Sequence, residues 1–533
     1  MARPDDEVAA DRPPAAAADR GPLHDVVVVS DLHLGRGKNP DSGRYFSLEA
    51  FFYDEDFRRF CRYLIADARV RAVPLRLVFN GDVFDLLRVE PLPAGPDASA
   101  RERRYGPDGG ETSAARMVAE ILAGHPVFVD AVAELLASGV EVVFLPGNHD
   151  IELQLDDVQV ELRRALLERV GDGAQGDAAE AVARADAGLR FAPWFHHEPG
   201  RLWIEHGCQY DAESAFRYPL RRSHPGADPA GAEAEAEADL PLGNFFQRYL
   251  YNSFGHITFI VPSTRANFRY LRWMIAHRPA LVAKVLTSQL PFVFQLLRRL
   301  RSGLAPGRQA LQATHEERLA TLARESGLGE RLLAIDALKG VRHDLVEALF
   351  ALGYQLFKIT SASLMGALCV LGLWFAGFQT INQLRFGTGL KAALFLMLNF
   401  LFISAAAAGA AYALLRGPPD TPPTPLFRAA RFIAGLVDVP IVTFGHTHDE
   451  ALWRIDRPSG APAWYYNTGT WIAVFTHDDL MPREQVQFTY LRVRGLSAEL
   501  LQWSPGRGEP LPVILLDEET RWGPVHPKGA PAP

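Results

Sequence analysis

Residues 26–33 read VVVVSDLH, four consecutive valines followed by a short polar turn that carries Asp31 and His33. An uninterrupted β-branched run is typical of a strand that is buried on both faces. Aspartate and histidine are both common metal ligands, and here they follow the run at once. The stretch therefore predicts a buried strand whose carboxyl end carries part of a metal site.

Four later segments repeat this arrangement, and helical patterns lie between the earlier ones. The predicted strands are 75–79, 140–145, 202–204 and 441–444, with helices over 48–65 and 114–136 and two further strands at 464–466 and 486–493. Buried strands that alternate with helices predict an α/β fold in which the central strands are covered on both faces.

Each of the five predicted buried strands ends in residue types that bind metal ions. The blocks are Asp31-Leu32-His33, Gly81-Asp82-Val83-Phe84-Asp85, Gly147-Asn148-His149-Asp150, His206-Gly207 and Gly445-His446-Thr447-His448. Open α/β sheets bind ligands outside the carboxyl ends of their strands, so the five blocks are expected to meet at one site. Carboxylate, imidazole and amide donors suit Mn, Fe, Co or Zn. A shared carboxylate could hold two ions about 3.5–4 Å apart, the spacing used in phosphoryl transfer.

In this order the blocks resemble the calcineurin-like metallophosphoesterase superfamily, whose pattern is DxH, GDxxD, GNHD or GNHE, a lone His after a strand, and GHxH. The resemblance covers a domain formed by residues 23–210 and 436–516. It implies a β-sandwich flanked by helices. It also implies hydrolysis of a phosphoric ester by water activated at two divalent ions, with manganese favoured over iron, zinc or cobalt.

The resemblance implies a role for each site residue. Asp31, His33, Asp82 and His448 match the first metal position, and Asp82, Asn148, His206 and His446 match the second, so that Asp82 bridges the two. His149 matches the group that contacts the phosphate and protonates the leaving oxygen. Asp85 matches the residue that orients this histidine, and Asp150 matches a supporting residue.

The layout is similar to that of the UDP-2,3-diacylglucosamine hydrolases, which share the DLHL opening and carry a lipid-gripping helical insertion. Two positions depart from that branch, because His149 replaces an arginine and Cys208 replaces an acid. Leu86 and Asp150 depart from the Ser/Thr protein phosphatases, which have Arg and Glu at these places. The resemblance therefore implies the chemistry and leaves the substrate open.

A long helical insertion over 211–435 separates the last ligand block from the others. Its segment 240–315 has no acidic residue but ten Lys and Arg among many aromatic residues. This composition suits a surface of anionic lipid head groups. It also suits single-stranded nucleic acid, which the neighbouring apolar runs make the less favoured partner.

Two runs of the insertion, 359–384 and 392–415, contain no charged residue. A membrane helix needs about 20 apolar residues, so the runs predict a transmembrane hairpin. The alternative is a helical hairpin buried within a soluble insertion. Two crossings keep all ligand blocks on one side, and Lys and Arg are more frequent outside the hairpin than in its loop. This bias predicts a catalytic domain on the cytoplasmic side of an inner or plasma membrane.

The remaining composition constrains the protein less. The formal net charge of −8 gives no global reason to expect nucleic-acid binding. Cys61, Cys208 and Cys369 form no disulfide framework, which fits a reducing compartment. Residues 1–22 and 517–533 are expected to be disordered tails. The sequence does not determine the oligomeric state.

Three functional hypotheses follow from the sequence. The leading one is a membrane-associated two-metal phosphoesterase that hydrolyses a phosphoester or pyrophosphate bond of a lipid-linked or nucleotide-sugar substrate. The second is a tethered phosphodiesterase or nuclease that acts on a soluble substrate. The third is a non-catalytic membrane scaffold whose metal site is structural.

Overall fold

The protein is described by a computed structural model. The described residues are 24–88, 105, 110–221, 239–249, 252, 259–260, 279–280, 307–341, 370–416, 425–475, 486 and 488–513. Both predicted tails lie outside these residues. So do most of the predicted basic aromatic segment, 240–315, and the first part of the predicted transmembrane run 359–384.

Seven strands form the first sheet, which is mixed. Its order is β14 (Glu509–Pro512), β13 (Ser497–Ser504), β12 (Thr489–Arg494), β1 (Asp25–Val29), β2 (Leu75–Asn80), β3 (Glu141–Leu145) and β4 (Leu189–Phe191). Strands β1 to β4 are parallel, and β12 joins β1 antiparallel. The carboxyl ends of β1, β2 and β3 therefore lie at the same edge of this sheet.

Five strands form the second sheet, which is also mixed. Its order is β5 (Phe195–Glu198), β6 (Leu202–Glu205), β8 (Ile441–Phe444), β10 (Pro462–Thr468) and β9 (Glu450–Asp456). Strands β6, β8 and β10 are parallel. A short third pair joins β7 (Phe259–Ile260) to β11 (Val474–Phe475). All five predicted buried strands are confirmed as β1, β2, β3, β6 and β8.

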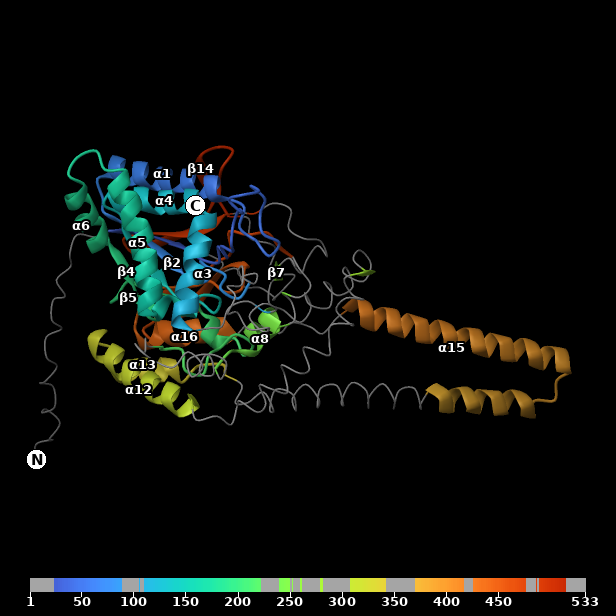
Figure 1. Ribbon diagram of the computed structural model, residues 1–533. Coiled ribbons are helices and arrows are strands. Elements are labelled where there is room, and N and C mark those ends of the chain that lie inside the picture. The colour runs from blue at the N-terminus through green and yellow to red at the C-terminus, as the bar shows by residue number, and fades with distance from the viewer. Residues whose placement is uncertain are drawn as a thin grey trace, which may run out of the picture.

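The two sheets pack face to face, and helices cover both outer faces. Val26, Val78, Leu202 and Ile441 belong to one apolar cluster that joins the sheets. A second cluster joins the first sheet to α1 (Asp54–Arg71), α3 (Glu111–Gly124), α4 (Pro126–Ala137), α5 (Asp156–Asp172) and α6 (Ala178–Gly188). A third joins the second sheet to α12 (Gly307–Glu325), α13 (Glu330–Asp336) and α16 (Pro425–Leu436). Figure 1 shows these helices on opposite sides of the strands.

The two predicted helices differ from the observed ones in their bounds. The predicted helix 48–65 begins at Asp54 and continues to Arg71. The predicted helix 114–136 is two helices, α3 and α4, which meet at His125. Pro126 explains the break, since proline restricts the residue before it to non-helical conformations and donates no backbone hydrogen bond. His125 accordingly has φ −124° and ψ 54°.

Parts of the insertion share the core of the second sheet. Leu332 and Ile335 on α13 belong to the same apolar cluster as Trp203 on β6 and Val442 on β8. His315 on α12 is buried, and its Nδ1 accepts a hydrogen bond from the Leu220 backbone N–H. These helices are thus built onto the outer face of the second sheet.

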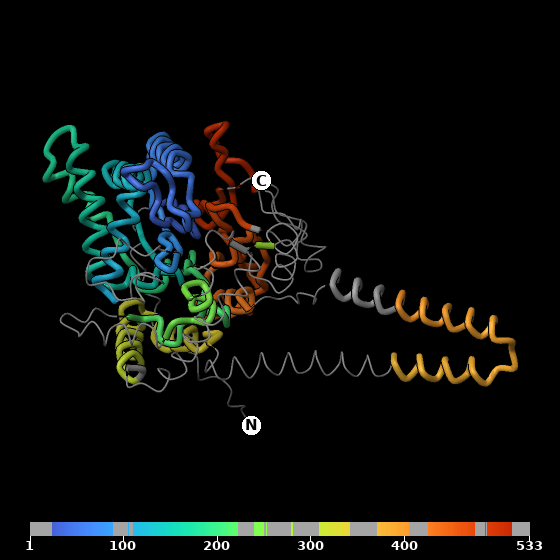
Figure 2. The backbone as a smooth tube through the Cα atoms, turned by 45° about the vertical axis from the view of Figure 1, so that its right-hand side comes forward, coloured from blue at the N-terminus to red at the C-terminus, as the bar shows by residue number. Residues whose placement is uncertain are grey.

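The predicted transmembrane hairpin is a pair of helices that projects from the body (Figures 1 and 2). The first described helix covers 370–383, and the second is α15 (Thr388–Arg416). Trp374 donates from Nε1 to Asn399 Oδ1, and the ring of Phe378 contacts that of Phe395. Within the described residues, no helix has both the length and the apolar character required to cross a bilayer. The structure therefore does not support the prediction that these helices span a membrane.

Candidate metal centre

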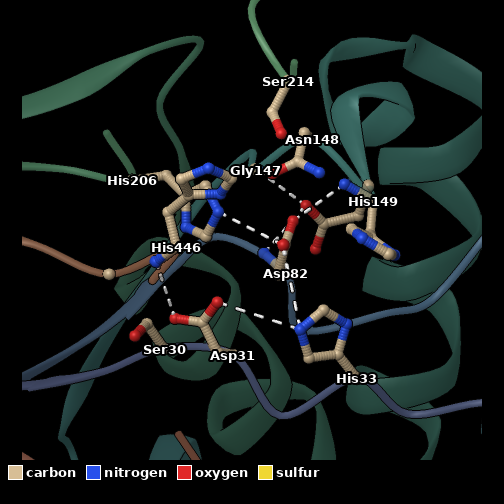
Figure 3. A network of polar contacts seen from close by, with 12 residues as sticks. Ser30, Asp31, His33, Asp82, Gly147, Asn148, His149, His206, Ser214 and His446 are labelled. Carbon is tan, nitrogen blue, oxygen red and sulfur yellow. Dashed lines mark hydrogen bonds and ion pairs between the residues drawn. The ribbon is translucent and has the colours of Figure 1, made fainter. Parts of the chain in front are cut away.

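The predicted ligands meet at the end of the two packed sheets where the preceding strands terminate. β1 leads to Asp31 and His33, β2 to Asp82, and β3 to Asn148, while β6 leads to His206 and β8 to His446 and His448. Figure 3 shows Asp31, His33, Asp82, Asn148, His206 and His446 facing one another. The seven predicted ligands are all buried. Parallel strands place their carboxyl ends together, which is why residues far apart in the chain converge here.

Several residues of the ligand loops have left-handed backbone conformation. Among the described residues, eight that are not glycine have positive φ, and five of these are predicted ligands: Asp31, His33, Asp82, His446 and His448. Left-handed backbone at a residue other than glycine costs free energy, on the order of 1–3 kcal/mol, and such residues cluster at functional sites. The turns aim consecutive side chains inward immediately after each strand ends.

Two glycines allow the ligand loops to approach one another. A Cβ atom on Gly147 would lie 2.1 Å from Asp82 Oδ1, and one on Gly445 would lie 2.5 Å from Asp31 Oδ2. Any other residue would collide with a ligand carboxylate. The glycines of the GNHD and GHxH blocks are therefore required by the close packing of the ligands.

The first group that could hold a metal ion comprises Asp31, His33, Asp82 and His448. Asp31 Oδ1 lies 3.3 Å from His448 Nε2 and 3.8 Å from His33 Nε2. The other oxygen of Asp31, Oδ2, accepts the backbone N–H of His446 at 3.1 Å. One carboxylate oxygen is thus used to tie two ligand loops together, while the other faces the histidines.

The second group comprises Asp82, His206 and His446, so Asp82 belongs to both groups. His206 Nδ1 lies 2.8 Å from the Asn80 carbonyl oxygen, to which it donates. This bond leaves Nε2 as the ligand atom, 3.2 Å from Asp82 Oδ2. His206 Nε2 and Asn148 Oδ1 are buried and have no hydrogen-bond partner among the described residues. Two such atoms beside a shared carboxylate fit a metal ion well.

The charges of the site favour a cation. Burial alone would raise the pKa of Asp82, but the positive charge of His206 and His149 outweighs it and lowers that pKa. Burial alone would lower the pKa of His206, but Asp82 and Asp31 raise it to about 9. Burial lowers the pKa of His448 to about 4, so this ligand is already neutral, whereas His206 would give up its proton when a metal ion binds. The carboxylates therefore stay ionised and stabilise positive charge between them.

His149 lies beside the two groups and is held by Asp85. Its Nδ1 lies 2.9 Å from Asp85 Oδ1, and its backbone N–H donates to Asp82 Oδ1 at 2.8 Å. Burial would raise the pKa of Asp85, but His149 and His33 lower it, so the carboxylate is ionised. An ionised carboxylate on Nδ1 fixes the tautomer and orientation of the ring.

Asp150 ties the ligand loops together. Its carboxylate accepts the backbone N–H groups of Asp82, Val83, Phe84 and Gly147 at 2.6–3.2 Å. Burial and the charge of Asp82 raise its pKa to about 7. All of these contacts are to backbone, which fits the predicted supporting role.

Two residues at the site were missed in the sequence. Asp211 Oδ2 lies 3.0 Å from His446 Nε2, and Asn244 exchanges hydrogen bonds with Asn148. Both fall within the predicted insertion, where no motif marks them. The only sequence signal is the position of Asp211 shortly after His206, and it is weak.

Buried Asp and His groups at this site could hold a metal ion. The identity of the ion, the number of ions and the role of each ligand stay predictions. No protein-family model matches the chain. A comparison with curated proteins likewise gives no match.

Proposed function

We propose that the protein is a two-metal phosphoesterase that hydrolyses a phosphoester or pyrophosphate bond. The observation that carries the proposal is that Asp82 is shared by two adjoining groups of buried His and Asp side chains. When bound, a pair of divalent ions, Mn²⁺ being favoured, would activate water and clamp the oxygens of a displaced phosphoryl group. The chain supplies the rest: Asp85 orients His149 beside the pair, where it can donate a proton to a leaving oxygen.

Turnover of generic substrates tests this proposal. Purified protein with Mn²⁺ is expected to hydrolyse bis(4-nitrophenyl) phosphate, and a chelator should stop the reaction until Mn²⁺ is restored. Release of 4-nitrophenolate is measured by its absorbance. A lack of metal-dependent turnover across phosphomonoesters, phosphodiesters and pyrophosphates would favour the scaffold hypothesis.

The substrate class is proposed from the hairpin. Leu371, Leu373, Phe375, Leu396, Met397, Phe400, Leu401 and Ile403 are exposed apolar residues on its two helices. A group of exposed apolar residues on one projecting element is typical of a site of contact with a membrane or a protein. We favour a membrane with the phosphoesterase domain on its cytoplasmic side, and hence a lipid-linked or nucleotide-sugar substrate. The alternative is a soluble substrate cut by an enzyme that is only tethered.

Removal of the hairpin is expected to release the protein from membranes. The full-length protein should sediment with membranes and resist extraction by high salt, because salt screens charges but leaves apolar contacts intact. A variant that lacks residues 358–416 should stay in the supernatant and still hydrolyse the aryl phosphodiester, since the hairpin projects from the body (Figure 2) and supplies none of the candidate ligands.

Point variants refine the same experiment. Leu396→Glu combined with Phe400→Glu should weaken membrane binding. Val160→Glu should leave it unchanged, because Val160 is also an exposed apolar residue but lies on α5 of the body. Clean release of the full-length protein by salt alone would contradict membrane binding through the hairpin.

A further inference from the structure

We infer that Asn244, on α8 (Leu242–Tyr249) of the insertion, is a positioning residue that orients Asn148 toward the second metal position. The inference rests on the proposed two-metal function and extends it, because it makes the insertion part of the metal-binding machinery. Asn244 is buried and lies next to the GNHD block, although the two residues are far apart in the sequence.

The hydrogen bonds between the two asparagines fix the direction of both amides. Asn244 Nδ2 donates to the Asn148 backbone carbonyl at 2.7 Å. A carbonyl oxygen can only accept, so this bond determines which end of the Asn244 amide carries nitrogen. Asn244 Oδ1 is then left to accept from Asn148 Nδ2, and these atoms are 3.3 Å apart.

The side-chain oxygen of Asn148 is left to bind a metal ion. Because Nδ2 is held by Asn244, Oδ1 occupies the other end of the amide, where it is buried without a hydrogen-bond partner among the described residues. An amide oxygen is the atom with which asparagine binds divalent ions. Without Asn244, the amide could rotate and present Nδ2, which cannot bind a cation. Partners of this kind hold metal ligands in the binding orientation.

The helix that carries Asn244 is itself anchored beside the site. Gly243 donates its backbone N–H to the Glu213 carbonyl oxygen at 2.7 Å, close to the start of the insertion. Phe245 and Tyr249 are buried against Tyr105. After the helix, Asn252 Nδ2 donates to the Leu87 carbonyl oxygen at 2.6 Å, near Asp85. Asn244 is therefore held in place by contacts near the start of α8 and just after its end.

Manganese binding tests the inference independently of turnover. In the full-length protein, Asn244→Ala is expected to weaken binding of the second Mn²⁺ by about 10- to 100-fold and to leave the first unchanged. Isothermal titration measures both affinities. At two Mn²⁺ ions per chain, the electron paramagnetic resonance spectrum should be that of a coupled Mn²⁺ pair in the wild type. In Asn244→Ala it should be mainly that of a single ion.

Two further variants separate positioning from folding. Asn244→Asp keeps an oxygen that accepts from Asn148 Nδ2 but loses the donor to the Asn148 carbonyl oxygen, so it should restore only part of the second-site affinity. Gln247→Ala removes a half-buried amide on the same helix, one that bonds to Asn252, and should leave both affinities unchanged. Thermal unfolding without metal checks that every variant folds.

The possible outcomes distinguish this inference from the proposed function. If the wild type binds no pair of ions, the proposed two-metal function fails. If the wild type binds two ions and Asn244→Ala binds both with the same affinities, the positioning role of Asn244 is overturned. Equal weakening by Gln247→Ala and Asn244→Ala would also overturn it, because the effect would then come from displacement of α8.

Discussion

Asp82→Asn is expected to lose most of its bound metal and to reduce phosphodiester hydrolysis to the background rate. Asp82 belongs to both groups of candidate ligands, with Oδ2 3.2 Å from His206 Nε2 and 3.8 Å from His33 Nε2. The substitution removes one negative charge that both ions would share, and an amide is a weaker ligand than a carboxylate for divalent ions. Elemental analysis of the purified protein measures the metal that remains.

A comparison with His33→Ala shows whether Asp82 bridges. His33 could contact only the first of the two adjoining positions, so its removal should chiefly weaken one ion and spare more of the total metal. If Asp82→Asn kept the full metal content of the wild type, the bridging assignment would be contradicted. An equal loss in the two variants would mean that Asp82 serves one position only.

Asp438→Asn is a matched control for Asp82→Asn. Both aspartates have left-handed backbone, with φ 53° at Asp438 and φ 52° at Asp82, and asparagine accepts this conformation as readily as aspartate. Asp438 is on the surface and pairs with Arg457 at 2.8 Å. Its replacement should leave metal content and turnover unchanged, which excludes backbone strain as the cause of the Asp82 effect.

The strands and the convergence of the ligand blocks could be predicted because both depend on local sequence. Val26 to Val29 are β-branched, and the polar turn after them begins at once. Parallel strands then bring such turns together without any knowledge of the sheet order. The division into two sheets could not be predicted in this way, because a run such as 202–204 shows a strand but not its neighbours.

The contributions of the insertion could not be predicted, because they depend on tertiary packing. Asn244 lies in a helix whose sequence resembles that of any short amphipathic helix, and it reaches the site only because α8 packs on Tyr105 and bonds to Glu213. Asp211 meets His446 for a similar reason, since β6 and β8 are neighbours in the second sheet. The charge and the hydrophobic periodicity of a sequence do not predict which residues become neighbours in the folded protein.

His149→Ala is expected to keep its metal content and to lose turnover by about 10²- to 10⁴-fold, the usual contribution of a general acid. His149 is held by Asp85 at 2.9 Å, but the group His33, Asp85 and His149 could also hold an ion. The two roles differ in metal content, which elemental analysis measures. Loss of metal in this variant would make His149 a ligand and contradict its role as a proton donor.

The leaving group decides what His149 contributes to the chemistry. An alkoxide needs a proton as it leaves, whereas 4-nitrophenolate is stable without one, so the loss in His149→Ala should be much larger for an alkyl phosphodiester than for a nitrophenyl one. Equal losses would indicate that His149 only contacts the phosphate. His197→Ala on β5 is the control, since His197 belongs to none of the metal-binding groups among the described residues. Its turnover with both substrates should equal that of the wild type, so that a selective loss on the alkyl ester is assigned to the proton that His149 donates.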